Sequence, residues 1–245
     1  MMIFALFESP KPCLASAGWV GLSSAIPGVG QTINGNPLEG LGYLVSTIYL
    51  MSSKSAVVKS MGFDLWMYNM YDAYRDARPS GSAFSDQNIF QNLSAPFYPP
   101  NFLDWRGATL VAAGAAAGAH QQYPALKKPE LIAKYAFVGF GEEALFRGFV
   151  LPSFTDSFHS KGWGIVLSSA VFSVAHAATG DGSALAPSVL VVRWILGMWL
   201  AWQADSNKYD LRKNIFAHAW YDVLVDSTGS TNDIRPIMGV RFFLP

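Results

Sequence analysis

Residues Gly141-Glu142-Glu143-Ala-Leu-Phe-Arg147 place three ionisable side chains inside one apolar, helix-forming stretch. Two later stretches do the same, Phe172-Ser-Val-Ala-His176 and His218-Ala-Trp-Tyr-Asp222. A charged side chain at the centre of a membrane helix costs about 2.5–3.5 kcal/mol on insertion scales, and such residues usually face a protein interior and carry function. The three stretches therefore predict helices whose polar faces meet inside the protein.

The composition favours a membrane protein. The chain is 51% hydrophobic and only 14% charged, whereas a soluble domain carries about 25% charged residues. The mean hydropathy is +0.23. The formal net charge of +0 offers no basic surface, so nucleic acid is excluded as a partner. Cys13 is the single cysteine, which rules out an intrachain disulfide and a cysteine-based zinc site.

The apolar segments predict an all-α fold, a polytopic transmembrane helical bundle with a four-helix catalytic core. A membrane-spanning helix needs about 20 mostly apolar residues. Four stretches of the C-terminal half come near that length, at Leu131–Phe154, Gly162–Ala178, Leu185–Ala204 and Leu211–Val225. We therefore expect an integral, multi-pass protein with membrane lipid around it.

Turn signals and composition divide the chain into five segments. We expect an N-terminal helical hairpin plus an interfacial amphipathic helix at 1–78, a polar and aromatic linker at 79–104, an Ala/Gly-rich helix at 105–126, the core at 127–228 and a C-terminal tail at 229–245. The amphipathic helix at Phe63–Arg78 could equally be a soluble connector helix.

Helical geometry assigns different surroundings to the two adjacent glutamates. Each residue of an α-helix advances by about 100°, so Glu143 and Arg147 share one face. They should form an ion pair that leaves Glu142 aimed elsewhere. The same spacing places Phe172 over His176, and His218 over Asp222. Each of the three helices thus offers one polar face.

Four groups could converge to form a hydrolytic site, namely Glu142, His176, His218 and Asp222. A carboxylate in an apolar cavity gains proton affinity, which makes it a usable general base near neutral pH. Two imidazoles nearby can hold a water molecule and donate to developing negative charge. Each element alone has a structural alternative, a packing histidine or a stabilising Glu–Arg pair, but the ordered set favours water-dependent cleavage of an amide.

The motifs Glu142-Glu143-x-x-x-Arg147, Phe172-x-x-x-His176 and His218-x-x-x-Asp222 resemble, in order and spacing, the CAAX protease and bacteriocin-processing (CPBP) family of intramembrane proteases. The resemblance covers about residues 127–228. It implies an intramembrane endopeptidase in which Glu142 activates water, His176 positions it, and His218 with Asp222 stabilises the oxyanion. Glu143, Arg147 and Phe172 would be supporting residues. A protein or peptide substrate would have to reach the bilayer.

Two features of the predicted site leave alternatives open. The family often has Asn at the position of Asp222, and an ionised Asp only accepts hydrogen bonds, so Asp222 should be protonated or should orient His218. Glu142, His176, His218 and Asp222 are also acceptable zinc ligands. The zinc-protease motif His-Glu-x-x-His is absent, and we favour chemistry without a metal or other cofactor.

Other functions are compatible with parts of the sequence. A catalytically silent membrane binding, immunity or scaffold protein would use the same polar residues as a structural network, and a transporter would use them along an ion route. Arg193, inside the third C-terminal helix, could pair with an acidic neighbour or contact a substrate carboxylate. The N-terminal hairpin loosely resembles small bacterial membrane modules of unknown function, which favours the bacterial inner (cytoplasmic) membrane as the location.

Overall fold

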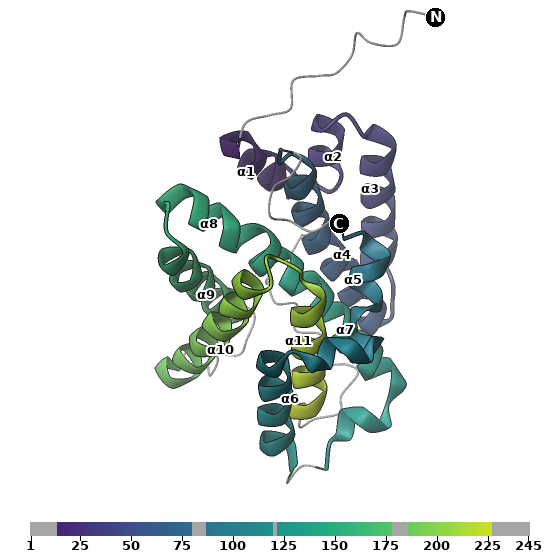
Figure 1. The fold of residues 1–245 in the computed structure, drawn as a ribbon. Helices are drawn as coiled ribbons and strands as arrows, with labels where there is room; N and C mark the ends of the chain where they lie inside the picture. The colour runs from purple at the N-terminus through teal and green to yellow at the C-terminus, as the bar shows by residue number, and fades with distance from the viewer. Residues whose placement is uncertain (1–13, 80–86, 120–121, 178–185, 227–245) are drawn as a thin grey trace, which may run out of the picture.

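The computed structural model describes residues 14–79, 87–119, 122–177 and 186–226, and within these ranges the secondary structure is helical throughout (Figure 1). The prediction of an all-α fold is therefore confirmed. The N-terminal elements are α1 (Leu14–Ser23), α2 (Val29–Ile33), α3 (Pro37–Met51), α4 (Ala56–Asp76), α5 (Ile89–Ser94), η1 (Ala95–Phe97) and η2 (Pro99–Leu103). The C-terminal elements are α6 (Trp105–Gly118), η4 (Pro124–Lys127), α7 (Pro129–Glu142), η5 (Glu143–Val150), α8 (Leu151–Phe158), α9 (Lys161–Ala177), α10 (Pro187–Ser206) and α11 (Arg212–Val225). The tail expected at 229–245 lies outside the described residues.

Helix α4 is buried along most of its length, which corrects the expectation of an interfacial helix at Phe63–Arg78. Four of its aromatic side chains, those of Trp66, Tyr68, Tyr71 and Tyr74, are at most 9% exposed. Its polar groups find partners inside the protein, because Asn69 hydrogen bonds to the backbone of Ser24 and Gly28. Satisfied polar groups can be buried at little cost. The alternation of aromatic and polar residues therefore reflects a core helix with internal partners.

Glycines allow α7 to lie against two helices at once. A Cβ atom on Gly139 would stand 2.9 Å from the carbonyl oxygen of Ile215 in α11. One on Gly141 would stand 2.6 Å from the Cα atom of Asp64 in α4. Only a residue without a side chain permits such close backbone approach. Glu142 follows directly and is consequently enclosed by protein.

The expected helix at Leu131–Phe154 is present but changes its winding at Glu143. The segment η5 is π-helical, and the N–H of Leu151 donates to the carbonyl oxygen of Phe146, five residues earlier. Short π-helical segments occur frequently at functional sites. The other three expected helices correspond to α9, α10 and α11, with ends shifted by a few residues.

The part of the expected linker from Ile89 to Leu103 is folded into α5, η1 and η2. It packs on α11, where the indole N–H of Trp220 donates to the carbonyl oxygen of Pro96 at 2.9 Å. In Figure 1, α11 lies beside α6, while α8, α9 and α10 form a group away from α3.

None of the helices in the described ranges combines the length and the apolar character that crossing a membrane requires. The expected membrane-spanning helices are therefore not confirmed. The surface nevertheless carries large apolar side chains, among them those of Leu38, Leu41, Val45 and Ile48 on α3, and of Val191, Val192 and Ile195 on α10.

Candidate active site

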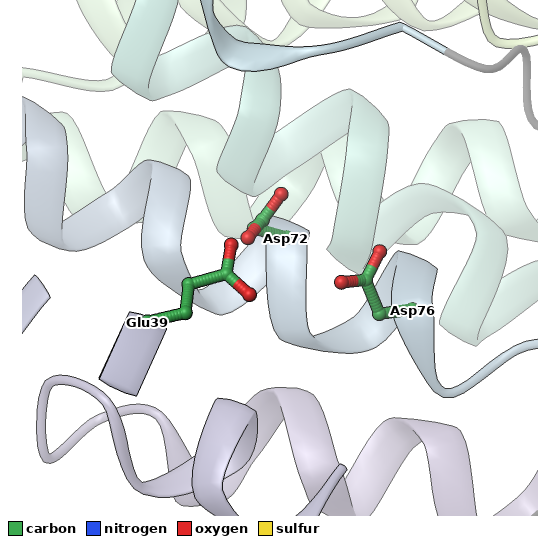
Figure 2. A group of neighbouring side chains, drawn as sticks. All are labelled: Glu39, Asp72 and Asp76. Carbon is green, nitrogen blue, oxygen red and sulfur yellow. The ribbon is translucent and has the colours of Figure 1, made fainter. Parts of the chain in front are cut away.

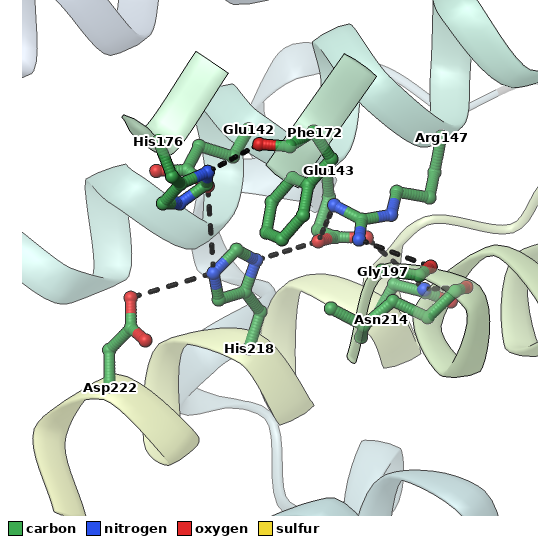
Figure 3. A network of polar contacts seen from close by, with 10 residues as sticks. Glu142, Glu143, Arg147, Phe172, His176, Gly197, Asn214, His218 and Asp222 are labelled. Carbon is green, nitrogen blue, oxygen red and sulfur yellow. Dashed lines mark hydrogen bonds and ion pairs between the residues drawn. The ribbon is translucent and has the colours of Figure 1, made fainter. Parts of the chain in front are cut away.

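Glu142, the last residue of α7, occupies the centre of the site. Its side chain is fully buried, and neither carboxyl oxygen has a hydrogen-bond partner in the described part of the chain. The Oε2 atom lies 3.5 Å from Nε2 of His176 and 3.7 Å from Nε2 of His218 (Figure 3). Burial raises the pKa of the Glu142 carboxyl well above its usual value, and the positive charge of His218 partly opposes this. Burial thus gives the Glu142 carboxyl a higher affinity for a proton than an exposed carboxyl has.

His176 faces Glu142 with its Nε2 atom. The other ring nitrogen, Nδ1, lies 2.7 Å from the carbonyl oxygen of Phe172. A carbonyl oxygen only accepts, so Nδ1 carries the proton and Nε2 of the neutral ring presents a lone pair to Glu142. Burial lowers the pKa of His176 to about 3, although the hydrogen bond to Phe172 opposes it. His176 is therefore neutral and can accept a hydrogen bond from water.

Glu143 connects the first motif to α11. One of its oxygens, Oε1, accepts hydrogen bonds from Arg147 at 2.9 Å and from Nδ1 of His218 at 2.6 Å. The other, Oε2, accepts from the Asn214 amide at 3.1 Å. Burial alone would raise the pKa of Glu143, but Arg147 and His218 outweigh it and hold the pKa below its usual value. The predicted Glu143–Arg147 pair is confirmed, and it also fixes the orientation of His218.

His218 is the cationic member of the centre. Burial alone would lower its pKa, but the carboxyl groups of Asp222, Glu143 and Glu142 outweigh burial and raise the pKa to about 9. Because Nδ1 donates to Glu143, the second N–H, on Nε2, points toward Glu142 and Asp222. His218 can therefore donate a hydrogen bond into the site.

Asp222 lies one helical turn beyond His218, as the spacing predicts. Its Oδ2 atom is 3.5 Å from Nε2 of His218. Burial raises the pKa of Asp222 above its usual value, while the charge of His218 acts in the opposite direction. The Nδ1 atom of His218 is already bound by Glu143. Asp222 therefore does not orient the His218 ring through that atom.

The Phe172 ring lies between the second motif, which contains His176, and the first motif, which contains Arg147. Its centroid lies 4.2 Å from that of the His176 ring, and the Arg147 guanidinium carbon lies 4.3 Å from the Phe172 centroid. A cation over an aromatic face is attracted by the ring quadrupole. Phe172 therefore packs against both the imidazole and the supporting arginine.

A cavity of about 570 Å³ opens onto these groups. Its lining includes Glu142, His176, His218, Asp222, Arg193 and apolar side chains of α10. All four predicted reacting residues thus border one space. Sequence reasoning missed Asn214, although its position four residues before His218 in an apolar helix was a signal that could have identified it.

The donor atoms of the site do not gather as zinc ligands would. In the ranges that the structure describes, the ligand atoms that all lie within 4.8 Å of one another belong to Glu39, Asp72 and Asp76 (Figure 2). Those of Glu142, His176, His218 and Asp222 do not form such a group. A zinc ion bound by all four does not fit, and we derive no step through a metal.

Two of the three carboxyl groups in the Glu39, Asp72 and Asp76 cluster pair with a cation of the protein itself. The Arg75 guanidinium lies 2.7 Å from Asp72 and 2.9 Å from Asp76. The Tyr43 hydroxyl donates to Asp72 at 3.0 Å. Burial raises the pKa of Asp72 to about 7, although Arg75 opposes it. The cluster is therefore a structural contact between α3 and α4.

Fold and site together define an all-helical protein with a buried glutamate flanked by two imidazoles, a centre suited to water activation. Residues 124–224 match the family model described as Type II CAAX prenyl endopeptidase Rce1-like. This match confirms the CPBP resemblance for the C-terminal half of the chain and supports a protease at the level of the family. No curated protein and no solved structure matches the chain.

Proposed function

We propose that the protein is a glutamate-dependent endopeptidase that hydrolyses peptide bonds of a protein or peptide substrate at a membrane. The observation that carries the proposal is the fully buried Glu142 carboxyl, which has no hydrogen-bond partner in the described residues and faces two imidazoles across 3.5 and 3.7 Å. These separations exceed a direct hydrogen bond, and the adjoining cavity has room for a water molecule beside the three groups.

The first step is attack by this water. One of its hydrogens points to the Glu142 carboxylate and the other to the Nε2 lone pair of His176. Glu142 takes a proton while the water oxygen bonds to the scissile carbonyl carbon. The C–N bond then breaks as the protonated Glu142 gives that proton to the leaving amine. The second hydrogen of the water stays with the new carboxyl group, and the Glu142 carboxylate is restored.

The carbonyl oxygen gains negative charge in this step and needs a donor. The Nε2–H of cationic His218 is suited to that role because Glu143 fixes the ring and keeps it charged. An ionised Asp222 would repel an oxyanion, so its role in the proposal is to sustain the charge of His218, 3.5 Å away, rather than to contact the oxyanion.

The membrane setting rests on the surface and on the family match. Exposed aliphatic side chains on α3 and α10 form the kind of apolar surface that binds lipid or a protein partner. The matched family is described by its action on CAAX prenyl substrates, and a prenyl chain partitions into lipid. We propose membrane lipid as a partner and an integral, multi-pass location in a bacterial inner membrane.

Replacing Glu142 by Gln tests the mechanism. We expect hydrolysis of a proteome-derived peptide library, read by mass spectrometry, to fall by about 100-fold or more, the usual contribution of a general base. Glu130→Gln, at the exposed start of the same helix, is the matched control and should keep full activity. Retained cleavage in Glu142→Gln would exclude this mechanism. No cleavage by the parent protein would instead favour a silent scaffold.

A chelator tests the absence of a metal from the proposed reaction. Because the four donors do not gather as a common ligand set, we expect EDTA to leave the rate of peptide hydrolysis unchanged, and added zinc to give no increase. Loss of activity with EDTA and recovery with zinc would contradict the proposal.

A further inference from the structure

Arg193 lines the cavity of the site, yet it has no partner in the described part of the chain. It projects from α10, and its Nη1 atom is buried without a hydrogen bond. The acidic neighbour that the sequence allowed for is not found among the described residues. A buried guanidinium nitrogen without an acceptor costs free energy. A ligand with a hydrogen-bond acceptor would remove this cost by binding the Arg193 guanidinium.

The other arginines in comparable surroundings are paired. Arg147 binds Glu143 and stacks on Phe172. Arg106 lies 3.5 Å from Asp104 and over the Trp202 ring. Arg193 differs from both because it borders open space rather than a protein carboxylate or ring. This difference indicates that Arg193 is available to bind a ligand that enters the cavity.

The surroundings of Arg193 restrict what that ligand can be. Val189, Val192 and Leu196 of the same helix line the cavity beside it. The carboxyl groups that border the cavity lie on the opposite wall, namely Glu142 of α7, Asp222 of α11 and Asp226 directly after α11, and Lys134 and His218 line that wall as well. Among the described residues, the α10 side of the cavity offers an anion a cation with no carboxyl group on the same wall, and apolar parts of the ligand can pack on Val189 and Val192.

We propose that Arg193 binds a carboxylate of the substrate and so selects peptides that carry one at a fixed spacing from the scissile bond. The planar guanidinium matches a carboxylate with two parallel hydrogen bonds. A terminal α-carboxylate and an Asp or Glu side chain supply the same chemistry. The inference rests on the proposed peptidase function and adds a specificity-determining residue to it.

The test compares the parent protein, Arg193→Gln, Arg193→Lys and the exposed-surface control Lys127→Gln on one peptide library. Peptides cleaved by the parent are then resynthesised with the terminal carboxylate amidated, or with each acidic side chain replaced by its amide. Whichever change neutralises the bound carboxylate should lower kcat/KM of the parent by about 10- to 100-fold, the usual range for a charge-assisted hydrogen bond.

Arg193→Gln should show the same loss on the charged peptide and no further loss on the neutral one, while Arg193→Lys keeps part of the preference. Lys127→Gln should behave like the parent. The inference is overturned if amidation and side-chain replacement leave kcat/KM of the parent unchanged, a result that needs no variant to fold. The inference is also overturned if Arg193→Gln prefers the charged peptide over the neutralised one as strongly as the parent does. Absence of all cleavage by the parent overturns the proposed function itself.

Discussion

At the scale of single residues, two adjacent glutamates have opposite relations to the protein around them. Glu143 accepts hydrogen bonds from Arg147, His218 and Asn214, whereas Glu142 accepts none in the described part of the chain. We expect Glu143→Gln to lower the free energy of unfolding by about 3 to 5 kcal/mol, because it leaves the Arg147 charge buried and unpaired. Because burial raises the pKa of Glu142, its carboxyl costs stability above the ordinary glutamate pKa of about 4.3, and Glu142→Gln should be neutral or stabilising there.

Thermal unfolding of both variants, followed by circular dichroism, checks this contrast. An equal loss of Tm in both would show that Glu142 is a structural group like its neighbour. Because Glu142→Gln is also the activity test, a folded but inactive protein would separate catalysis from stability within a single variant.

Asp222→Asn tests the electrostatics of the centre through the pH profile. The charge of Asp222 raises the pKa of His218 and that of Glu142. Activity requires ionised Glu142 on the acid side and protonated His218 on the alkaline side, so the parent should lose activity above about pH 9. Removing the charge lowers both pKa values, and both limbs of the kcat/KM profile should move to lower pH, by about one pH unit.

An unchanged profile in Asp222→Asn would show that Asp222 is already protonated over the working range and acts as a donor. Asn keeps an N–H donor at the same position, so the rate at the optimum should stay within about tenfold of the parent, the cost of one altered hydrogen bond.

Local residue geometry was predictable from the sequence, but contacts between helices were not. The i, i+4 rule predicted the Glu143–Arg147 pair and the approach of His218 to Asp222, and both are present. It could not predict that Glu143 would hold His218, 75 residues away, since that contact depends on how α11 crosses η5. The contact of Asn214 with Glu143 depends on the same crossing, although the position of Asn214 one turn before His218 marked it as a residue of the polar face.

At the scale of elements, the close crossing of α4 and α7 depends on Gly141. A Cβ atom there would stand 2.6 Å from Cα of Asp64. We expect Gly141→Ala to lower the free energy of unfolding by about 1–3 kcal/mol through overpacking. Gly42→Ala is the matched control. Nothing lies within 4 Å of its added Cβ, and it should stabilise α3 by about 0.5–1 kcal/mol. Denaturant unfolding measures both, and equal effects would contradict the close crossing.

The lengths of the apolar stretches predicted where the helices of the C-terminal half lie. They did not predict that α4 is buried. Its polar and aromatic residues resemble an amphipathic surface helix when read alone. Its burial depends on partners from α1, α3 and α7. The Tyr43 hydroxyl donates to Asp72, and the Tyr68 ring stacks on the Phe140 ring with a centroid separation of 4.4 Å. Such partners are known only once the chain has folded.

At the scale of the whole molecule, the N-terminal helices share one hydrophobic core with the site. Tyr68, Tyr71 and Tyr74 of α4 belong to the same buried cluster as Phe140, Phe146 and Phe172. The family match begins only at residue 124, so part of the support for Glu142 comes from a segment outside it. Asp64 of α4, 1% exposed, faces the backbone of Gly141, next to Glu142.

We therefore expect the fragment 105–245 to fail to fold by itself, although it contains every residue of the proposed catalytic centre. Removing α4 uncovers Phe140, Phe146 and Gly148, against which Tyr71 packs, and exposed aromatic surface of this kind favours aggregation. Circular dichroism and limited proteolysis of the purified fragment would show loss of the cooperative unfolding transition. Co-expression with residues 1–104 should restore both the transition and peptide cleavage. A fragment that unfolds cooperatively and cleaves peptides alone would show that the N-terminal helices are dispensable for the site.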